Sequence, residues 1–432
     1  MEQLLQRMLT QNPWWEGKEI DTGIPREQYL TVIKKYLRTK EILLINGVRR
    51  SGKTTILHQT INYLLTSGVS AEEILFISCD SPELLSAENT VFKAIDIFRK
   101  KTGNNGKIWL FLDEVQAIDD FPRIVKTLYD EGNTHLIISG STSYLLESKA
   151  GTLLSGRYLP LTVHPLNFKE YLRFTGINVP ENELALFSKR YELIAALERY
   201  MKTGGFPAVV MMSDEEVGNE LMAAYYDSIV YRDIIQAHNI RSSALLAKLL
   251  MYLITNISSQ VSVLNLSKVF SCNARTIDDF LEFAQDAYLI YLVPYFTYSL
   301  KTQTRMLAKS YLIDTGIRHA VSSAFSPDTG KCMENIVCIE LIRRGYKPAY
   351  WTGKNEVDFV VRDRNHELTA INVCYTDEIP EREFAGLNEF ESTNPEKNIH
   401  KILLSEDTED MDGDIQIIPL WKWLLQESDS FV

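Results

Sequence analysis

Short apolar runs alternate with amphipathic stretches over the first part of the chain, from Glu41 to about Val163. Stretches such as Thr54–Leu65 and Phe121–Asp130 repeat apolar residues with the period of a helix, and the runs between them have the length of buried strands. Strands and helices in alternation predict an α/β fold, in which helices cover both faces of a parallel sheet. The predicted strands are Ile42–Ile45, Ile74–Ser78, Ile108–Leu112, Leu136–Ser139 and Tyr158–Val163.

The pattern changes twice after this α/β region. From Leu166 to about Asn256 the strand-like runs stop, and amphipathic stretches predict helices with a break at Gly204–Pro207. The next stretch, 261–296, predicts helix, tight turn, helix and β-ribbon, which is the order of a winged helix. From about Gly330 a second small α/β unit begins. Its predicted elements are a helix at Glu334–Arg343 and strands at Glu356–Val361, Leu368–Tyr375, Ile402–Leu404 and Ile415–Ile418.

A glycine-rich segment follows the first predicted strand and matches the pattern G-x-x-x-x-G-K-[ST]. Its glycines let backbone N–H groups turn inward around phosphates, and the helix that follows directs its N-terminus at the anion. Lys53 reaches the terminal phosphates, and the Thr54 hydroxyl is a ligand of Mg²⁺. We therefore expect ATP and Mg²⁺ to bind here, and the residues expected at the nucleotide are Gly47, Arg50, Ser51, Gly52, Lys53, Thr54 and Thr55.

Two carboxylates end the apolar strand that begins near Ile108. Asp113 is expected to bind the nucleotide's Mg²⁺ together with Thr54, through water. Glu114 stands one residue further, where a carboxylate can activate the attacking water. The alternative is a pair of acids that simply end a strand in solvent, and the preceding phosphate-binding motif favours the catalytic interpretation.

Two further residues are candidates from their order along the chain. Ser141 follows the strand Leu136–Ser139 and is expected to touch the γ-phosphate or the water, with Ser139 as the second choice. Arg157 follows a helical stretch at Tyr144–Lys149 and precedes the last predicted strand of the sheet. An arginine there can reach a neighbouring subunit's ATP and stabilise transition-state charge, which implies a homo-oligomer. A solvated or locally paired arginine is the alternative.

Composition narrows the class of protein. The 432 residues suggest two to four domains, and the formal net charge is −12, so any contact with nucleic acid depends on a local basic patch. Five cysteines without a CxxC pair predict reduced thiols and no zinc site. The chain shows neither a signal-peptide pattern nor an apolar run long enough to span a bilayer, so we expect a soluble cytoplasmic protein.

Several motifs together resemble a known family. The motifs, in their order along the chain, are GVRRSGKTT, FLDEVQ, IISGSTSYLL, LSGR, PLNFKEYL, GGFP, YRDI, YLIDTG, ENIVCIELIRRG and EVDFVV. Together they are similar to bacterial and archaeal AAA+ ATPases that carry a conserved C-terminal domain of unknown function. The similarity runs from about Arg26 to Ile418, nearly the whole chain.

This resemblance implies an architecture and a set of roles. It implies an N-terminal extension (1–25), a P-loop ATPase core (26–165), a helical lid (166–256), a winged helix (257–325) and a C-terminal domain similar to PD-(D/E)xK nucleases (326–432). No arginine of the lid matches the second sensor of such ATPases. The implied roles are Walker A for Lys53 and Thr54, Walker B for Asp113 and Glu114, sensor 1 for Ser141 and arginine finger for Arg157.

The C-terminal unit keeps only part of the chemistry of the nuclease fold that it resembles. Glu334 and Asp358 fit two of the carboxylate positions. On the next predicted strand, Asn372 stands where a glutamate is needed and Cys374 where a lysine is needed. Metal-dependent cleavage requires the full set, so we expect a structural or DNA-docking module without nuclease activity. The alternative source of a missing carboxylate is Asp377 or Glu378.

The predicted winged helix gives an ambiguous signal for DNA. Three polar residues begin its second helix, but three acids follow on the same helix and are unfavourable near phosphate. Basic residues of the following ribbon can compensate, so DNA contact and interdomain packing both stay open. The polar residues are Asn273, Arg275 and Thr276, the acids Asp278, Asp279 and Glu282, and the basic residues Lys301, Arg305 and Lys309.

The leading functional hypothesis is an AAA+ ATPase that uses hydrolysis to change its own shape or that of a partner, on DNA or on a protein. The winged helix and the C-terminal domain are the candidate sites of DNA contact, if DNA is a partner. A slow nucleotide-dependent switch is the second hypothesis. An ATP-controlled nuclease is the third, and Asn372 and Cys374 argue against it.

Overall fold

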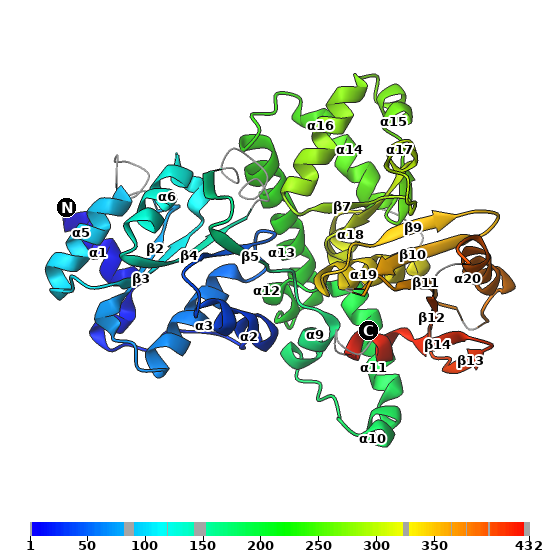
Figure 1. The fold of residues 1–432 in the computed structure, drawn as a ribbon, viewed down its shortest axis with the longest axis horizontal. Helices are drawn as coiled ribbons and strands as arrows, with labels where there is room; N and C mark the ends of the chain where they lie inside the picture. Colours follow the sequence, from blue (N-terminus) through cyan, green and yellow to red (C-terminus); the bar gives the residue numbers. More distant parts are fainter. Residues whose placement is uncertain are drawn as a thin grey trace. The chain divides into compact units, whose positions relative to one another are not determined.

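The computed structural model describes residues 2–81, 90–118, 120–141, 153–322, 328–363, 365–376, 378–395 and 398–426. The chain divides into two compact units, Met1–Val163 and His164–Val432 (Figure 1). The predicted helical stretch at Tyr144–Lys149 lies outside the described residues, and so does Asp377. No helix among the described residues is both long enough and apolar enough to cross a membrane.

The first unit contains the predicted parallel sheet. Its five strands lie in the order β2-β3-β4-β1-β5, so β4 separates β1 from β3. The α/β fold predicted from the alternation of apolar runs is confirmed, and each strand lies within two residues of its predicted bounds. The strands are β1 (Ile42–Asn46), β2 (Ile74–Ser78), β3 (Ile108–Asp113), β4 (Thr134–Gly140) and β5 (Tyr158–Thr162).

Helices cover both faces of this sheet, because successive side chains of a strand point to opposite faces. Leu43 and Ile45 of β1 pack in one apolar core with α2 (Glu27–Tyr36) and α3 (Lys53–Thr66). Ile42 and Leu44 pack in the other core, with residues of α1 (Glu2–Gln11), α5 (Thr90–Thr102) and α6 (Phe121–Glu131). Residues of the predicted N-terminal extension therefore belong to the core of this unit, and Met8 is buried there.

Helices alone build the first part of the second unit, as predicted. They pass from α11 to α12 through the predicted glycine break, where the Gly205 carbonyl accepts a hydrogen bond of 2.6 Å from Leu166 N. A π-helical segment, Ile229–Gln236, follows the fifth helix. The helices are α9 (Phe168–Phe174), α10 (Glu183–Ser188), α11 (Arg190–Thr203), α12 (Pro207–Val210), α13 (Glu215–Ser228) and α14 (Ser243–Thr255).

A small antiparallel sheet follows, with strand order β6-β8-β7. Two helices separated by a short turn lie between its first and second strands, in the order that the sequence predicts. Its function as a DNA-binding winged helix stays a prediction. The elements are β6 (Ser259–Val261), α15 (Val263–Val269), α16 (Ala274–Asp286), β7 (Ile290–Val293), α17 (Leu300–Gln303) and β8 (Ala308–Leu312).

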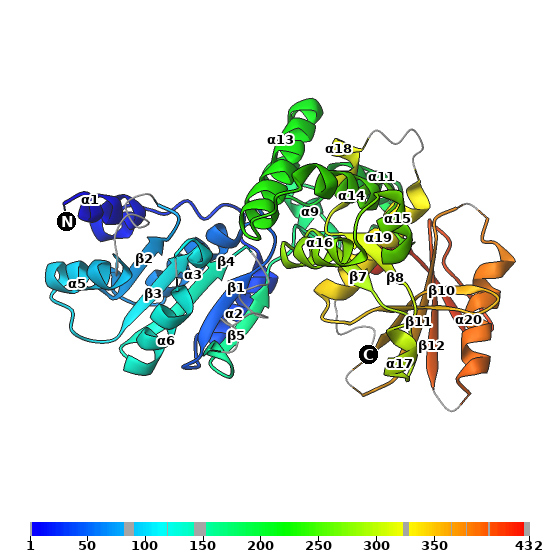
Figure 2. The ribbon, with the colours of Figure 1, turned by 90° about the horizontal axis from the view of Figure 1, so that it is seen from above.

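The last part of the chain forms a mixed six-stranded sheet in the order β13-β14-β12-β11-β10-β9. Figure 2 shows α20 (Glu381–Thr393) on one face of this sheet and α19 (Thr329–Arg343) on the other. Two short helices, α18 (Thr315–Val321) and α21 (Leu420–Leu425), precede and follow these elements. The strands are β9 (Ala349–Thr352), β10 (Glu356–Arg362), β11 (Leu368–Cys374), β12 (Ile399–Ser405), β13 (Asp410–Asp412) and β14 (Ile415–Pro419).

One apolar core joins segments that the sequence assigns to three domains. It contains Leu193 of α11, Tyr311 of β8, Met333 of α19 and Trp423 of α21. Residues on both sides of the predicted boundaries at 256/257 and 325/326 therefore pack in one core, and the division into domains stays a prediction.

Candidate functional site

The glycine-rich loop between β1 and α3 has a backbone that other residues adopt with difficulty. Gly47 has φ +133° and Gly52 has φ +98°, and Arg50 between them has φ +70°. A Cβ atom on Gly47 would lie 2.2 Å from the carbonyl oxygen of Val163. The loop therefore needs glycine at both ends, and it curves closely past the segment after β5.

Lys53 lies buried at the start of α3 and faces into the curve of the loop. Its Nζ donates hydrogen bonds to the carbonyl oxygens of Gly47 and Val48, at 3.0 and 3.1 Å. The buried hydroxyl of Ser51 has no hydrogen-bond partner. An unsatisfied donor, a lysine and the N-terminus of a 14-residue helix suit an anionic ligand. The residues present thus fit the phosphates that the sequence predicts here.

Arg26 is a contributor that the sequence reasoning missed. Its Nη1 donates to the carbonyl oxygen of Ser51 at 2.9 Å, and its guanidinium lies over the ring of Tyr29. Arg26 precedes the predicted motif by about twenty residues, so motif spacing gives no signal for it. Two residues predicted at the nucleotide are exposed, Arg50 in the loop and Thr55 in the first turn of α3.

Thr54 and Asp113 meet at the edge of the sheet where the parallel strands end. The Thr54 hydroxyl donates to Asp113 Oδ2 at 2.7 Å, and the Ser139 hydroxyl donates to Asp113 Oδ1. Burial raises the pKa of Asp113, and the charge of Glu114 adds to this, while Ser139, Thr54 and Lys53 oppose it. A hydroxyl beside a carboxylate is a donor set that suits Mg²⁺.

Glu114 is held in a left-handed conformation directly after this carboxylate, with φ +55°. Its backbone N–H donates to Ser139 Oγ at 3.1 Å, and its carboxylate accepts from Gln116 Nε2. Gln116 Nε2 also lies 3.0 Å from Ser141 Oγ. A positive φ at a non-glycine residue is costly, and such strain is concentrated at functional sites.

The two candidate serines have different hydrogen-bond partners. Ser139 binds the carboxylate of Asp113, whereas Ser141 is bonded by Gln116 and by Arg49 Nη2 at 3.4 Å. Ser139 lies on β4 and Ser141 directly follows it. β4 lies between β1, which precedes the glycine-rich loop, and β3, which ends at Asp113. Gln116 and Arg49 belong to the motifs FLDEVQ and GVRRSGKTT, but only the fold gives them a partner.

Arg157 lies at the end of the sheet where the parallel strands begin, away from the glycine-rich loop. Its carbonyl oxygen accepts a hydrogen bond of 2.8 Å from Ile42 N at the start of β1, and the loop follows the end of β1. β1 has five residues, so the two ends of this strand, one near Arg157 and the other at the loop, are about 16 Å apart. The guanidinium Nε lies 3.8 Å from Asp130 Oδ1 and near the Tyr129 ring. Arg157 is therefore not brought to the loop of its own chain.

In the second unit, Asn372 and Cys374 of β11 both contact neighbouring protein groups. Asn372 accepts from Asp358 N at 3.0 Å and donates to the Glu356 and Glu383 carbonyl oxygens and to the Glu383 carboxylate. Cys374 is a buried thiol 3.2 Å from Thr376 Oγ1. Within the described ranges, no group of three or more His, Cys, Asp or Glu residues is placed to hold a metal ion.

The interpretation of Lys309 as a basic residue available to DNA is wrong. Its ammonium is buried among the carboxylates of Glu334, Glu356 and Asp358. This arrangement was missed because Lys309 and Glu334 lie 25 positions apart.

The predicted DNA-contacting residues of α16 have local partners. Asn273 caps the helix by accepting a hydrogen bond of 2.9 Å from Arg275 N. The Arg275 side chain lies 3.9 Å from Asp279, although 87% of it is exposed. Lys301 and Arg305 are exposed in the following segment. DNA contact by these residues stays a prediction.

Comparison with known proteins divides the chain into three matched regions. Residues 39–172 match the family model described as AAA domain. Residues 194–328 and 329–423 match two domains of unknown function, DUF8612 and DUF4143. The AAA match contains the glycine-rich loop, Asp113, Glu114 and Arg157.

Two curated relatives align over most of their length. A protein of Methanocaldococcus jannaschii is 34% identical over 409 residues, which is 89% of this chain and 88% of the relative. A protein of Haemophilus influenzae is 32% identical over 418 residues, which is 93% of this chain and 99% of the relative. Both are described as uncharacterized proteins.

Similar solved structures include two nucleotide complexes at low identity. The Saccharomyces cerevisiae Hsp104–ADP complex is 15% identical, with a TM-score of 0.35 over 64% of this chain and 42% of that chain. AMPPCP-bound DnaA from Aquifex aeolicus is 17% identical, with a TM-score of 0.26 over 63% and 91%. At these TM-scores neither decides what this chain does.

Proposed function

The chain belongs to the family of AAA-domain proteins that includes these M. jannaschii and H. influenzae relatives, and from this membership we propose an AAA+ ATPase that binds and hydrolyses Mg²⁺-ATP. One observation carries the proposal. The hydrogen bond from Thr54 to Asp113 joins the glycine-rich loop to the acidic strand end, so that the groups for phosphate, metal and water share one edge of the sheet.

Each group has a distinct task in the proposed reaction. The backbone of 47–52 and Lys53 would bind and orient the phosphates. Thr54 and Asp113 would hold Mg²⁺, which when bound would neutralise charge on the phosphate oxygens. Glu114 accepts a proton from the attacking water at its carboxylate. Ser141, with Ser139 as the second choice, contacts the γ-phosphate or the attacking water at the end of β4.

The work done by hydrolysis is proposed to be a conformational change, acting on DNA or on a protein partner. A specific observation favours a slow switch as the second candidate. Gln116 binds the carboxylate of Glu114 and also contacts Ser141, so the proposed base is engaged by an amide. An engaged base accepts the proton of water less readily. Release of Gln116 is then required for each turnover.

Steady-state ATP hydrolysis with and without DNA, with molecular mass measured in the same nucleotide states, tests the proposal. Lys53→Ala is expected to abolish ATP binding, and the exposed Lys107→Ala serves as its matched control. Multiple turnovers that DNA or a protein partner accelerates support a motor, whereas one slow turnover with retained nucleotide supports the switch. A wild-type protein that binds no ATP contradicts both.

A further inference from the structure

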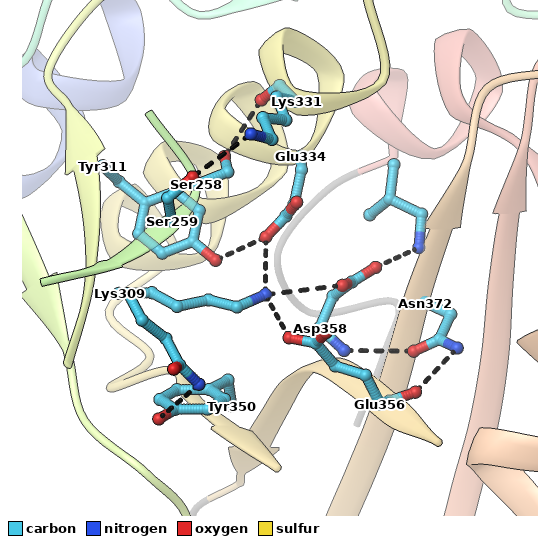
Figure 3. Close-up of polar contacts among 12 residues, drawn as sticks. Ser258, Ser259, Lys309, Tyr311, Lys331, Glu334, Tyr350, Glu356, Asp358 and Asn372 are labelled. Atoms are coloured by element: carbon cyan, nitrogen blue, oxygen red, sulfur yellow. Dashed lines mark hydrogen bonds and ion pairs between the residues drawn. The ribbon is translucent and has the colours of Figure 1, made fainter. Parts of the chain in front are cut away.

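A lysine from the three-stranded sheet ends among carboxylates of the neighbouring sheet and helix in the second unit (Figure 3). Lys309, on β8, places its Nζ 2.6 Å from Glu356 and 3.1 Å from Glu334. Asp358 lies 3.7 Å from the same atom. Glu334 comes from α19, and the two other acids come from β10. Three carboxylates from two elements therefore converge on one ammonium group.

The surroundings of this ammonium group are largely closed to water. The side chain of Lys309 is 7% exposed, that of Glu334 12% and that of Asp358 17%, whereas that of Glu356 is 48% exposed and borders the solvent. Tyr311 donates its hydroxyl hydrogen to Glu334 at 2.6 Å, and the ring of Tyr350 lies 5.5 Å from the ammonium nitrogen. Buried charges persist only when they are paired, so the lysine and the carboxylates depend on one another.

The electrostatics keep the lysine charged. Burial alone lowers the pKa of Lys309, but the carboxylates of Glu334, Asp358 and Glu356 outweigh it and raise that pKa above its usual value. Burial raises the pKa of Asp358, and so does the neighbouring charge of Glu334. Burial raises the pKa of Glu334 as well. The raised pKa values favour the protonated forms of these two acids, which reduces the negative charge around the single ammonium group.

The contact distances are those of an ammonium group paired with carboxylates. The nitrogen–oxygen separations of 2.6, 3.1 and 3.7 Å exceed the roughly 2.0–2.1 Å of Mg²⁺–oxygen bonds and are mostly longer than the roughly 2.3–2.6 Å of Ca²⁺–oxygen bonds. The carboxylates are hard oxygen ligands of the kind that divalent cations prefer. With Lys309 at the point on which they converge, these carboxylates are not placed to hold a metal ion.

We propose that Lys309 is the resident cation of this cluster and excludes divalent metal from it. The side chain supplies from β8 the positive charge that Glu334, Glu356 and Asp358 require. The wild-type protein takes up no divalent ion at these carboxylates, and removal of the ammonium converts them into a site for Mn²⁺ or Mg²⁺. This role is independent of the ATPase proposal, because the residues at the glycine-rich loop take no part in it.

Binding of Mn²⁺ to nucleotide-free protein tests the proposal, with isothermal titration calorimetry and the electron paramagnetic resonance of free Mn²⁺ as readouts. Lys309→Ala is expected to gain one bound Mn²⁺ that the wild type lacks. The double variant Lys309→Ala with Asp358→Asn is expected to lose it, because one ligand has become neutral. Lys331→Ala is the matched control, since Lys331 contacts Ser259 and Asp328 instead of this cluster, and it is expected to behave as the wild type.

Thermal unfolding keeps the test decisive if Lys309→Ala is unstable. Metal at about 100-fold above its Kd is expected to raise the unfolding midpoint of Lys309→Ala by about 5 °C and to leave the wild type unchanged. A variant that is unfolded without metal must regain its fold with Mn²⁺. The proposal is overturned if Mn²⁺ neither binds nor rescues Lys309→Ala, or if the wild type binds Mn²⁺ in a manner that Asp358→Asn abolishes.

Discussion

The Thr54 hydroxyl donates a hydrogen bond of 2.7 Å to Asp113, and this bond joins the first turn of α3 to the end of β3. β4 lies between β3, which carries Asp113, and β1, which precedes the loop and α3. Its Ser139 donates to the other oxygen of Asp113. Both oxygens of the carboxylate are therefore oriented by hydroxyl groups from neighbouring parts of the same edge. Glu114 follows directly, so its direction depends on this arrangement.

The first prediction concerns Glu114. Replacement by glutamine keeps the size of the side chain and removes the proton acceptor, so Glu114→Gln is expected to bind ATP normally and to hydrolyse it about 10²- to 10⁴-fold more slowly. A fluorescent-nucleotide titration measures binding, and phosphate release measures turnover. Lys53→Ala, expected to lose binding itself, distinguishes the two effects. Unchanged turnover in Glu114→Gln removes this residue from the water-activating role.

The second prediction concerns Arg157, which lies about 16 Å along the strands from its own chain's loop. If it reaches the ATP of a neighbouring subunit, Arg157→Ala is expected to reduce hydrolysis by roughly 10³-fold or more and to spare ATP binding. Arg123→Ala is a matched control. Arg123 is an exposed arginine on the first turn of α6, and it pairs with Asp120, the residue before the helix.

A mixture of variants separates action between subunits from a local role. Arg157→Ala protein supplies an intact Glu114, and Glu114→Gln protein supplies an intact Arg157. Their mixed interfaces are expected to recover part of the activity. Absence of recovery, together with a monomeric mass in the presence of ATP, assigns Arg157 to its contacts with Asp130 and Tyr129.

The third prediction is a pH dependence of stability. Asp314 is buried and accepts hydrogen bonds from Gly205 N and Gly316 N at 2.7 and 2.8 Å, and burial raises its pKa to about 6. The folded chain thus binds this proton more tightly than the unfolded chain does. The stability contributed by protonated Asp314 is complete below about pH 4 and is lost as pH rises to about 6.

The comparison that checks this prediction uses Asp314→Asn, which cannot ionise. The unfolding free energy of the wild type relative to this variant is expected to fall by on the order of 3 kcal/mol between pH 4 and pH 7. Denaturant unfolding at a series of pH values measures it. A difference that does not vary with pH shows that Asp314 has an ordinary pKa in the fold.

The fourth prediction is that the wild-type protein cleaves neither single-stranded nor double-stranded DNA in Mg²⁺, with or without ATP. Asn372 is engaged by backbone and Glu383 in place of a metal-binding glutamate, and Cys374 offers no cation to the hydrolytic water. End-labelled oligonucleotides provide the assay. Cleavage that Asp358→Ala abolishes would show that other groups complete the site.

The parallel sheet could be predicted from the sequence because its strands are short apolar runs between helical repeats. The glycine-rich motif and the acids after β3 could be located for the same reason, since their spacing is local. Gln116 and Arg26 were missed, because their partners Ser141 and Ser51 are set by the fold. Local patterns report the period of an element, and they carry no information on which distant element it meets.

Lys309 shows the same limit most clearly. In the sequence, Lys309 is one of several basic residues of a predicted ribbon. In the fold, its ammonium group pairs with three carboxylates. The shared core of the second unit could not be predicted for a related reason. A change of secondary-structure pattern at 256 or 325 does not reveal that Leu193 and Trp423 share one core.

The contact between α21 and α9 determines when the second unit can complete its fold during translation. Phe168 and Leu172 leave the ribosome about 250 residues before Trp421 and Trp423, with which they share a core. At a translation rate of about 5–20 residues per second, their apolar surface stays uncovered for roughly 10–50 s before α21 is synthesised. The first unit has all five strands of its sheet by Thr162 and needs no such delay. Nascent chains of this protein therefore pass through a stage with one finished unit and one that a chaperone can bind.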